Sequence, residues 1–149
     1  MTVLSFKSLR PVAVLLLAFS LSPSTTLAAE TVFVVVSAQS QVRALTQKDV
    51  LALYTGRSRV LPGGEVATPI DQLRDSTARA DFYQMLTGMD IARINSYWAR
   101  LHFTGQVQPP PPVGDDAAVI QRLRADPNAI GYVMQEPTGA AVRVVLRLP

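Results

Sequence analysis

Hydrophobic positions recur with two different periods along the chain after residue 30. Residues 31–36 form an unbroken, mostly β-branched apolar run, which is typical of a central strand buried on both faces. Residues 66–70 and 129–133 predict two further strands. Residues 142–148 predict the last strand, at a sheet edge with one wetter side. Its expected faces are Val142, Val144, Leu146 and Leu148 on one side and Arg143, Val145 and Arg147 on the other.

Helical periodicity fills the segments between these strands. The first helix is expected to follow Thr46 as its N-cap and to stop at Gly56. Later helices are expected to begin at residues 75–77, at Asp90 and at residues 114–116. The helix after Asp90 has an apolar stripe that we expect to face the core, made of Ile91, Ile94, Trp98 and Leu101.

The expected order of elements is β-α-β-α-α-α-β-β. Strands separated by helices favour a parallel or mixed sheet with helices on its faces. We therefore predict an α/β fold with a mixed, mostly parallel sheet flanked by helices. Consecutive prolines at residues 109–112 predict a stiff, extended crossover. Ligands on such sheets bind at the loops beyond the strand ends.

Residues 1–28 predict a cleavable export signal. Lys7 and Arg10 form a basic start, residues 12–21 form an apolar run, and polar and then small residues follow. The run is too short to span a bilayer as a stable helix, although a membrane anchor is the alternative reading. We expect residues 29–149 to form one domain that works in the periplasm.

Composition narrows the functions to consider. The chain of 149 residues has no Cys and a formal net charge of +3; without Lys7 and Arg10, 12 basic residues face 11 acidic ones, a net charge of +1. This charge is too small for a nucleic-acid partner. His102 is the only histidine, so a metal site is not expected. We find no nucleophile elbow, phosphate loop or paired carboxylates, and we expect neither enzymatic activity nor a cofactor.

Several segments resemble the phosphate-binding proteins of periplasmic ABC transport systems. Residues 45–57 resemble a helix followed by Phe-x-Gly-Lys, and residues 70–82 resemble the strand and hydroxyl-rich turn before the phosphate-cradling helix. Residues 96–112 match a pattern in short relatives, and residues 126–133 are similar to the Asn-Pro-Gly-Ala-Ile-Gly-Tyr strand. The resemblance implies the substrate-binding component of such a transporter in a shortened form. It implies about one lobe of a type II periplasmic-binding-protein-like fold, whose full members close two lobes on the ligand.

The residues point to one candidate anion site, at the start of the second helix. The family motif Arg-x-Asp-Gly-Ser-Gly-Thr aligns with the stretch that begins at Arg74; the Arg is kept, and the Gly-Ser-Gly-Thr core is not. Unpaired amides and the helix dipole attract anions at a helix start, where Ser76 and Thr77 add hydroxyl groups. Arg74 and Arg79 can add charge-assisted hydrogen bonds, and Ser37 is a further candidate donor. The alternative is an ordinary helix cap with solvated arginines.

Two functions stay open at this stage. The first is a periplasmic solute-binding protein that recognises a small oxyanion, with phosphate as the first candidate, for an ABC-type transport system. The second is an interaction module, a single lobe that has lost its cleft and docks a membrane transporter or sensor component. A homodimer whose two lobes form a cleft between chains is a further partner arrangement.

Overall fold

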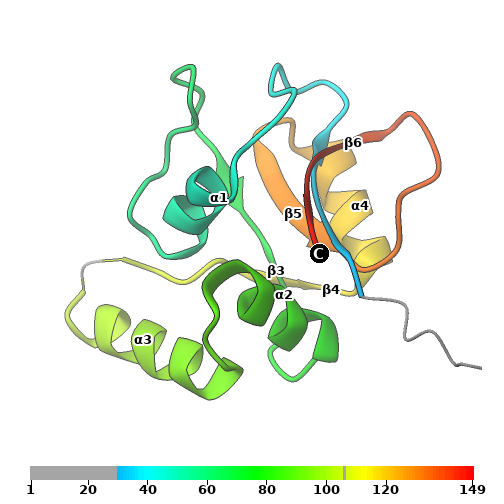
Figure 1. The fold of residues 1–149 in the computed structure, drawn as a ribbon. Coiled ribbons are helices and arrows are strands. Elements are labelled where there is room, and N and C mark those ends of the chain that lie inside the picture. Colours follow the sequence, from blue (N-terminus) through cyan, green and yellow to red (C-terminus); the bar gives the residue numbers. More distant parts are fainter. Residues whose placement is uncertain (1–29, 106) are drawn as a thin grey trace, which may run out of the picture.

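The computed structural model describes residues 30–105 and 107–149, so the predicted signal peptide lies outside the described residues. The chain forms an α/β fold in which helices cover both faces of a sheet (Figure 1). The elements in chain order are β1 (Val32–Ser37), α1 (Gln47–Tyr54), β2 (Thr68–Pro69), β3 (Asp71–Gln72), α2 (Thr77–Thr87), α3 (Ile91–Phe103), β4 (Pro112–Gly114), α4 (Asp116–Ala125), β5 (Ala129–Val133) and β6 (Val142–Leu148).

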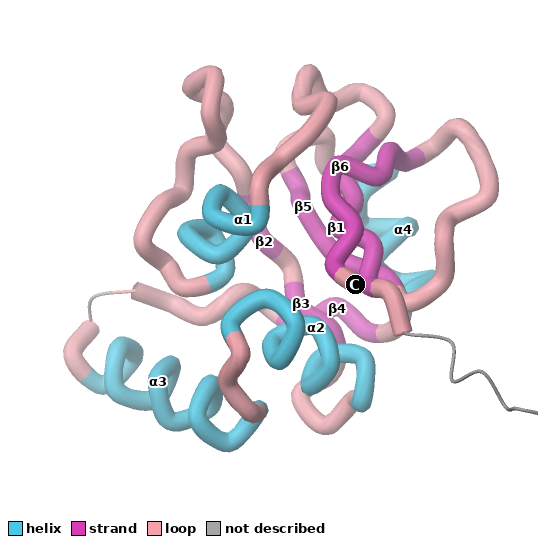
Figure 2. Tube along the Cα trace, in the orientation of Figure 1, coloured by secondary structure: helices cyan, strands magenta, loops and turns pink. Residues whose placement is uncertain are grey.

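The main sheet has four strands in the order β2-β5-β1-β6 (Figure 2). Strand β1 runs antiparallel to both β5 and β6, and only β2 and β5 pair in parallel. The sheet is therefore mixed, and the prediction of a mostly parallel sheet is wrong. Two strands that a helix connects become parallel when they are neighbours in the sheet. Helix α1 connects β1 to β2, but β5 lies between these two strands. The neighbours of β1 are therefore the C-terminal strands β5 and β6, and both run antiparallel to it.

Alternating side chains of β1 and β5 enter two separate apolar cores, one on each face of the sheet. Val34 and Tyr132 pack in the larger core with residues of α1, α2 and α3. Val35 and Val133 pack in the smaller core with residues of α4. The run at residues 31–36 is thus a central strand covered on both faces, as its lack of alternation predicted.

Side-chain caps fix the helix starts. Thr46 and Asp49 form a capping box at α1, where the Thr46 hydroxyl accepts from the Asp49 amide and the Asp49 carboxylate accepts from the Thr46 amide. Asp90 and Asp115 are the N-caps of α3 and α4, and each side chain accepts from the backbone amide three residues on, without the reciprocal bond of a capping box. Gly88 ends α2 in the left-handed conformation, with φ 73°. The helix starts predicted at Thr46, at Asp90 and at residues 114–116 are confirmed.

Two features of the strands depart from the sequence prediction. The pairing of β1 with β6 shifts register between Val34 and Val35, so the strict alternation expected for β6 breaks, and Val145 is buried in the larger core. The proline segment does more than cross the molecule, because Pro112 begins β4 and pairs in parallel with Asp71 of β3. That pairing holds the proline segment beside α3 and creates the walls of a pocket.

Candidate functional site

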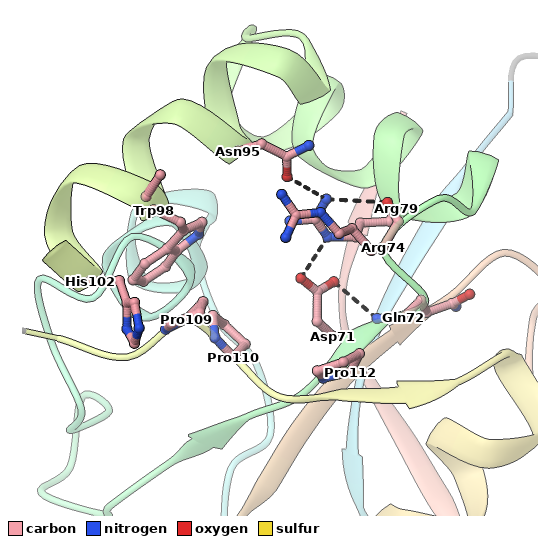
Figure 3. Close-up of a pocket in the computed structure, with 11 residues that line it drawn as sticks. Asp71, Gln72, Arg74, Arg79, Asn95, Trp98, His102, Pro109, Pro110 and Pro112 are labelled. Carbon is pink, nitrogen blue, oxygen red and sulfur yellow. Dashed lines mark hydrogen bonds and ion pairs between the residues drawn. The ribbon is translucent and has the colours of Figure 1, made fainter.

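A pocket with a volume of about 330 Å³ lies between α3, the start of α2 and the proline segment (Figure 3). We call it the α3 pocket. Its floor comes from β3, and its opposite sides come from α3 and from the prolines that lead into β4. The lining residues are Asp71, Gln72, Arg74, Arg79, Asn95, Trp98, Ala99, His102, Pro109, Pro110 and Pro112.

One stripe of α3 faces this pocket. Asn95, Trp98, Ala99 and His102 follow one another at intervals that place them on one side of a helix. Trp98 also belongs to the larger core, as its place in the apolar stripe predicted, so the same side chain anchors the helix and lines the pocket. The rotation of α3 that buries Ile94 therefore also presents this stripe to the pocket.

A buried ion pair forms the inner wall. Arg79 Nε donates to Asp71 Oδ2 over 2.8 Å, and the two residues are 6% and 3% exposed. Arg79 Nη1 donates to Asn95 Oδ1 over 3.0 Å and reaches the carbonyl oxygen of Arg74 at 3.4 Å. Figure 3 shows these contacts converging on the guanidinium group from α3 and from β3. Such a network fixes the direction in which the remaining guanidinium hydrogens point.

Both oxygens of the Asp71 carboxylate are hydrogen-bonded. Oδ1 accepts from the Tyr132 hydroxyl and from the Gln72 amide, and Oδ2 accepts from the Tyr83 hydroxyl as well as from Arg79. This arrangement is what an ionised carboxylate requires when it is removed from water. Asp71 is therefore held by α2, β3 and β5 at once.

The pKa values of the surrounding groups shift in the directions that burial and charge dictate. Burial and then the negative charge of Asp71 raise the pKa of Tyr83 and of Tyr132 well above the usual tyrosine range. Burial acts to lower the pKa of Arg79, but the hydrogen bond to Asp71 and its charge act more strongly together and raise this pKa. The tyrosines stay neutral donors and Arg79 stays a cation.

Arg74 gives the pocket an excess of positive charge. It is exposed on the loop before α2 and lines the pocket beside the Asp71–Arg79 pair. Two arginines and one aspartate are among the lining residues, which is an excess of one positive charge among the Asp, Glu, Lys and Arg side chains there. Arg74 forms no ion pair within residues 30–105 and 107–149, so it can attract an anion without first breaking one there.

The structure brings together only part of the predicted site. Arg74 and Arg79 line the same pocket, whereas Ser37, Ser76 and Thr77 are not among its lining residues. Ser76 is the N-cap of α2, and its hydroxyl accepts from the Arg79 amide and donates to the Leu73 carbonyl. Ser37 is buried at the end of β1, where its hydroxyl accepts from the Gln39 amide.

Several pocket residues were missed from the sequence. Asp71 directly follows the predicted strand at residues 66–70, which is a position where ligand-binding residues gather. Asn95 lies about one helical turn before Trp98 on α3, and His102 lies about one turn after it, so all three are on one stripe of the helix. Strand-end position and helical spacing were thus the available signals. Arg57 and Arg59, a further basic pair in the sequence, do not line this pocket.

Neither a metal centre nor a membrane span is evident in residues 30–105 and 107–149. These residues contain no group of three or more His, Asp or Glu side chains arranged to hold a metal ion. No helix within the same ranges has the length and apolar character needed to cross a bilayer.

Comparison with solved structures shows which fold this chain shares. It is similar to a protein described as a phosphate ABC transporter substrate-binding protein from Clostridium perfringens, with bound phosphate, at TM-score 0.61 and 16% identity, covering 76% of this chain and 43% of that one. It is similar to an ABC-type phosphate transport receptor from Vibrio cholerae, at TM-score 0.59 and 13% identity over 76% and 45% of the two chains. For PstS from Borrelia burgdorferi, the TM-score is 0.50 at 13% identity over 69% and 40%.

The chain has the fold of part of these three proteins. It spans less than half the length of each of them. No protein-family model and no curated protein sequence matches it. The resemblance inferred from residues 45–133 is thus confirmed at the level of three-dimensional structure, and the neighbours are binding proteins rather than enzymes by their descriptions.

Proposed function

We propose that this chain is an exported, single-lobe binding protein that recognises a small oxyanion in the α3 pocket, with phosphate as the first candidate, for an ABC-type transport system. The observation that carries this proposal is the placement of two arginines in one pocket with a net positive charge. The fold similarity to phosphate receptors supports the same ligand class.

The chemistry would be binding without reaction. Arg79 is pre-oriented by Asp71 and Asn95, so it loses little side-chain entropy when an oxyanion contacts its free edge. Arg74 is exposed and has no ion-pair partner in the described part of the chain, so it supplies the available positive charge. Ser76 and Thr77 do not line the pocket, so the start of α2 would contribute only the positive end of its helix dipole, next to Arg79. Ser37 has no part in this form of the site.

Isothermal titration calorimetry with inorganic phosphate tests the proposal. The wild-type protein should bind, and Arg74→Ala should weaken binding by about tenfold or more, because a charge-assisted hydrogen bond is worth roughly 1.5–3 kcal/mol. Arg57→Ala is the matched control, because Arg57 is exposed and does not line the pocket. Neither heat nor a thermal shift at millimolar phosphate would reject the proposal.

A second function, an interaction module without a ligand, is favoured by a different observation. Arg79 is already paired with Asp71, and the Ser76 hydroxyl already caps α2, so part of the predicted anion site serves the fold itself. In this case a membrane transporter or sensor component would bind the wild-type protein and Arg74→Ala equally. Recovery of the same membrane protein by both, together with silent calorimetry, would establish this alternative over the first.

A further inference from the structure

We propose that the ligand of the α3 pocket is an organic oxyanion, in which one anionic head carries an apolar or aromatic group. This inference rests on the proposed function of the same site and names its ligand class more narrowly. It follows from the size of the pocket, from the unequal chemistry of its walls and from a buried donor at Trp98.

The pocket is larger than an inorganic anion requires. Its volume of about 330 Å³ falls in the range of pockets that hold small organic molecules. A phosphate ion, with its oxygens around a single phosphorus atom, fills the space of only a few water molecules of about 30 Å³ each. Phosphate bound at the arginines would leave most of this space to water.

The polar and apolar groups of the pocket are segregated. Arg74, Arg79 and Asn95 lie toward one end of the pocket in Figure 3. Pro109 and Pro110 lie toward the other end, near Trp98 and His102 in the same view. The anionic head would bind at the arginine end, because prolines have no amide hydrogen to donate to it. The remainder of the ligand would lie against the rings of Trp98, His102 and the prolines.

Both apolar surfaces are rigid. Trp98 is 5% exposed and packs in the larger core, and the prolines have fixed φ angles and lead into the β3–β4 pairing. Gly56 permits the close packing behind Trp98, because a Cβ there would lie 3.1 Å from the indole ring. Preformed apolar walls bind an apolar group with little entropic loss.

Trp98 also contributes an unsatisfied donor. Its Nε1 atom is buried and has no hydrogen-bond partner among the described residues. The Trp98 side chain acts to lower the pKa of the Tyr83 hydroxyl, against the larger effects of burial and of the Asp71 charge, which raise it. In Figure 3 the nitrogen-bearing edge of the ring is turned toward Arg74 and Arg79. A ligand oxygen bound at this end would lie near this donor.

Calorimetry with a matched set of ligands tests the inference on the purified protein. The probes are phenylphosphonate, methylphosphonate, inorganic phosphate and phenol. Phenylphosphonate should bind on the order of tenfold more tightly than methylphosphonate, as expected when part of a phenyl ring is removed from water. His102→Ala should reduce this preference to roughly threefold, because it removes one ring from the apolar end. Phe103→Ala is the control and should keep the tenfold preference, since Phe103 is 94% exposed and does not line the pocket.

The outcomes separate this inference from the function on which it rests. Equal affinities for phenylphosphonate, methylphosphonate and phosphate would overturn the inference and leave oxyanion binding intact. Phenol binding as tightly as phenylphosphonate would overturn it as well, because the anionic head would then contribute nothing. Failure of every anion to bind would remove the proposed function itself, and the inference with it. Two results together would support both the inference and the proposed function. Arg74→Ala should weaken the binding of both phosphonates, and His102→Ala should narrow the difference between their affinities.

Discussion

Asp71 and Arg79 form an ion pair with 2.8 Å between Oδ2 and Nε, and both side chains are more than nine-tenths buried. The pair joins β3 to α2 and forms the inner wall of the α3 pocket. It therefore serves the fold and the site together. A buried charge that loses its partner is strongly destabilising, whereas an exposed pair contributes little.

Asp71→Asn should accordingly lower the free energy of unfolding by about 3–5 kcal/mol, because it leaves Arg79 charged and buried without its partner. Urea denaturation followed by circular dichroism measures the change. Glu136→Gln is the matched control: Glu136 pairs with Arg147 at the surface, where the side chains are 57% and 59% exposed, so its loss should be within about 1 kcal/mol. Similar losses in the two variants would contradict the assignment of a buried, structural pair.

The buried tyrosines predict a cooperative response to alkaline pH. Burial is the first cause that raises the pKa of Tyr54, Tyr83 and Tyr132, and the charge of Asp71 is the second. A group with a raised folded pKa contributes stability below its unfolded pKa, near 10 for tyrosine, and that stability falls as the pH rises above this value. Absorbance at 295 nm and circular dichroism should therefore change together above about pH 10. Ionisation of these three of the four tyrosines before any loss of structure would contradict the burial.

Gly131 sets how closely α4 approaches the sheet. A Cβ at this position would lie 2.6 Å from Val119 Cγ1 and 3.3 Å from Ile70 Cδ1. Gly131→Ala should therefore destabilise the protein by about 1–3 kcal/mol through overpacking. The double variant with Val119→Ala should lose less stability than the sum of the two single variants, because Val119→Ala removes Cγ1, the methyl group that the new Cβ would meet. Strict additivity in urea denaturation would show that the two positions do not meet.

Local signals in the sequence were sufficient to predict the helices and the central strand. Thr46, Asp90 and Asp115 act on amides within one turn, so their capping roles do not depend on distant parts of the chain. The unbroken apolar run of β1 indicates a strand covered on both faces, and this can be recognised from the residue types of the segment alone. The direction of the strands could not be predicted in this way, because it depends on β5 pairing between β1 and β2.

The candidate site was predicted in part for the same reason. Arg74 and Arg79 could be selected because they flank a predicted helix start. Asp71, the partner of Arg79, could not be selected in this way. Its position depends on the pairing of β3 with the proline segment and on the hydrogen bond from Tyr132, which is 61 residues away along the chain. The role of Ser76 as a cap could be anticipated only as one of two alternatives, since one hydroxyl can serve either a helix start or a ligand.

The most direct test of oxyanion binding in the α3 pocket uses the single tryptophan of the chain. In a ¹H–¹⁵N spectrum the Trp98 indole gives one isolated signal, and its nitrogen is a buried donor without a partner in the described residues. Titration with phosphate or phenylphosphonate should move this signal in a saturable manner in the wild-type protein and in Arg57→Ala. The same titration of Arg74→Ala should require a concentration about tenfold or more higher. An indole signal that stays fixed at saturating anion, or that moves identically in Arg74→Ala, would contradict the account.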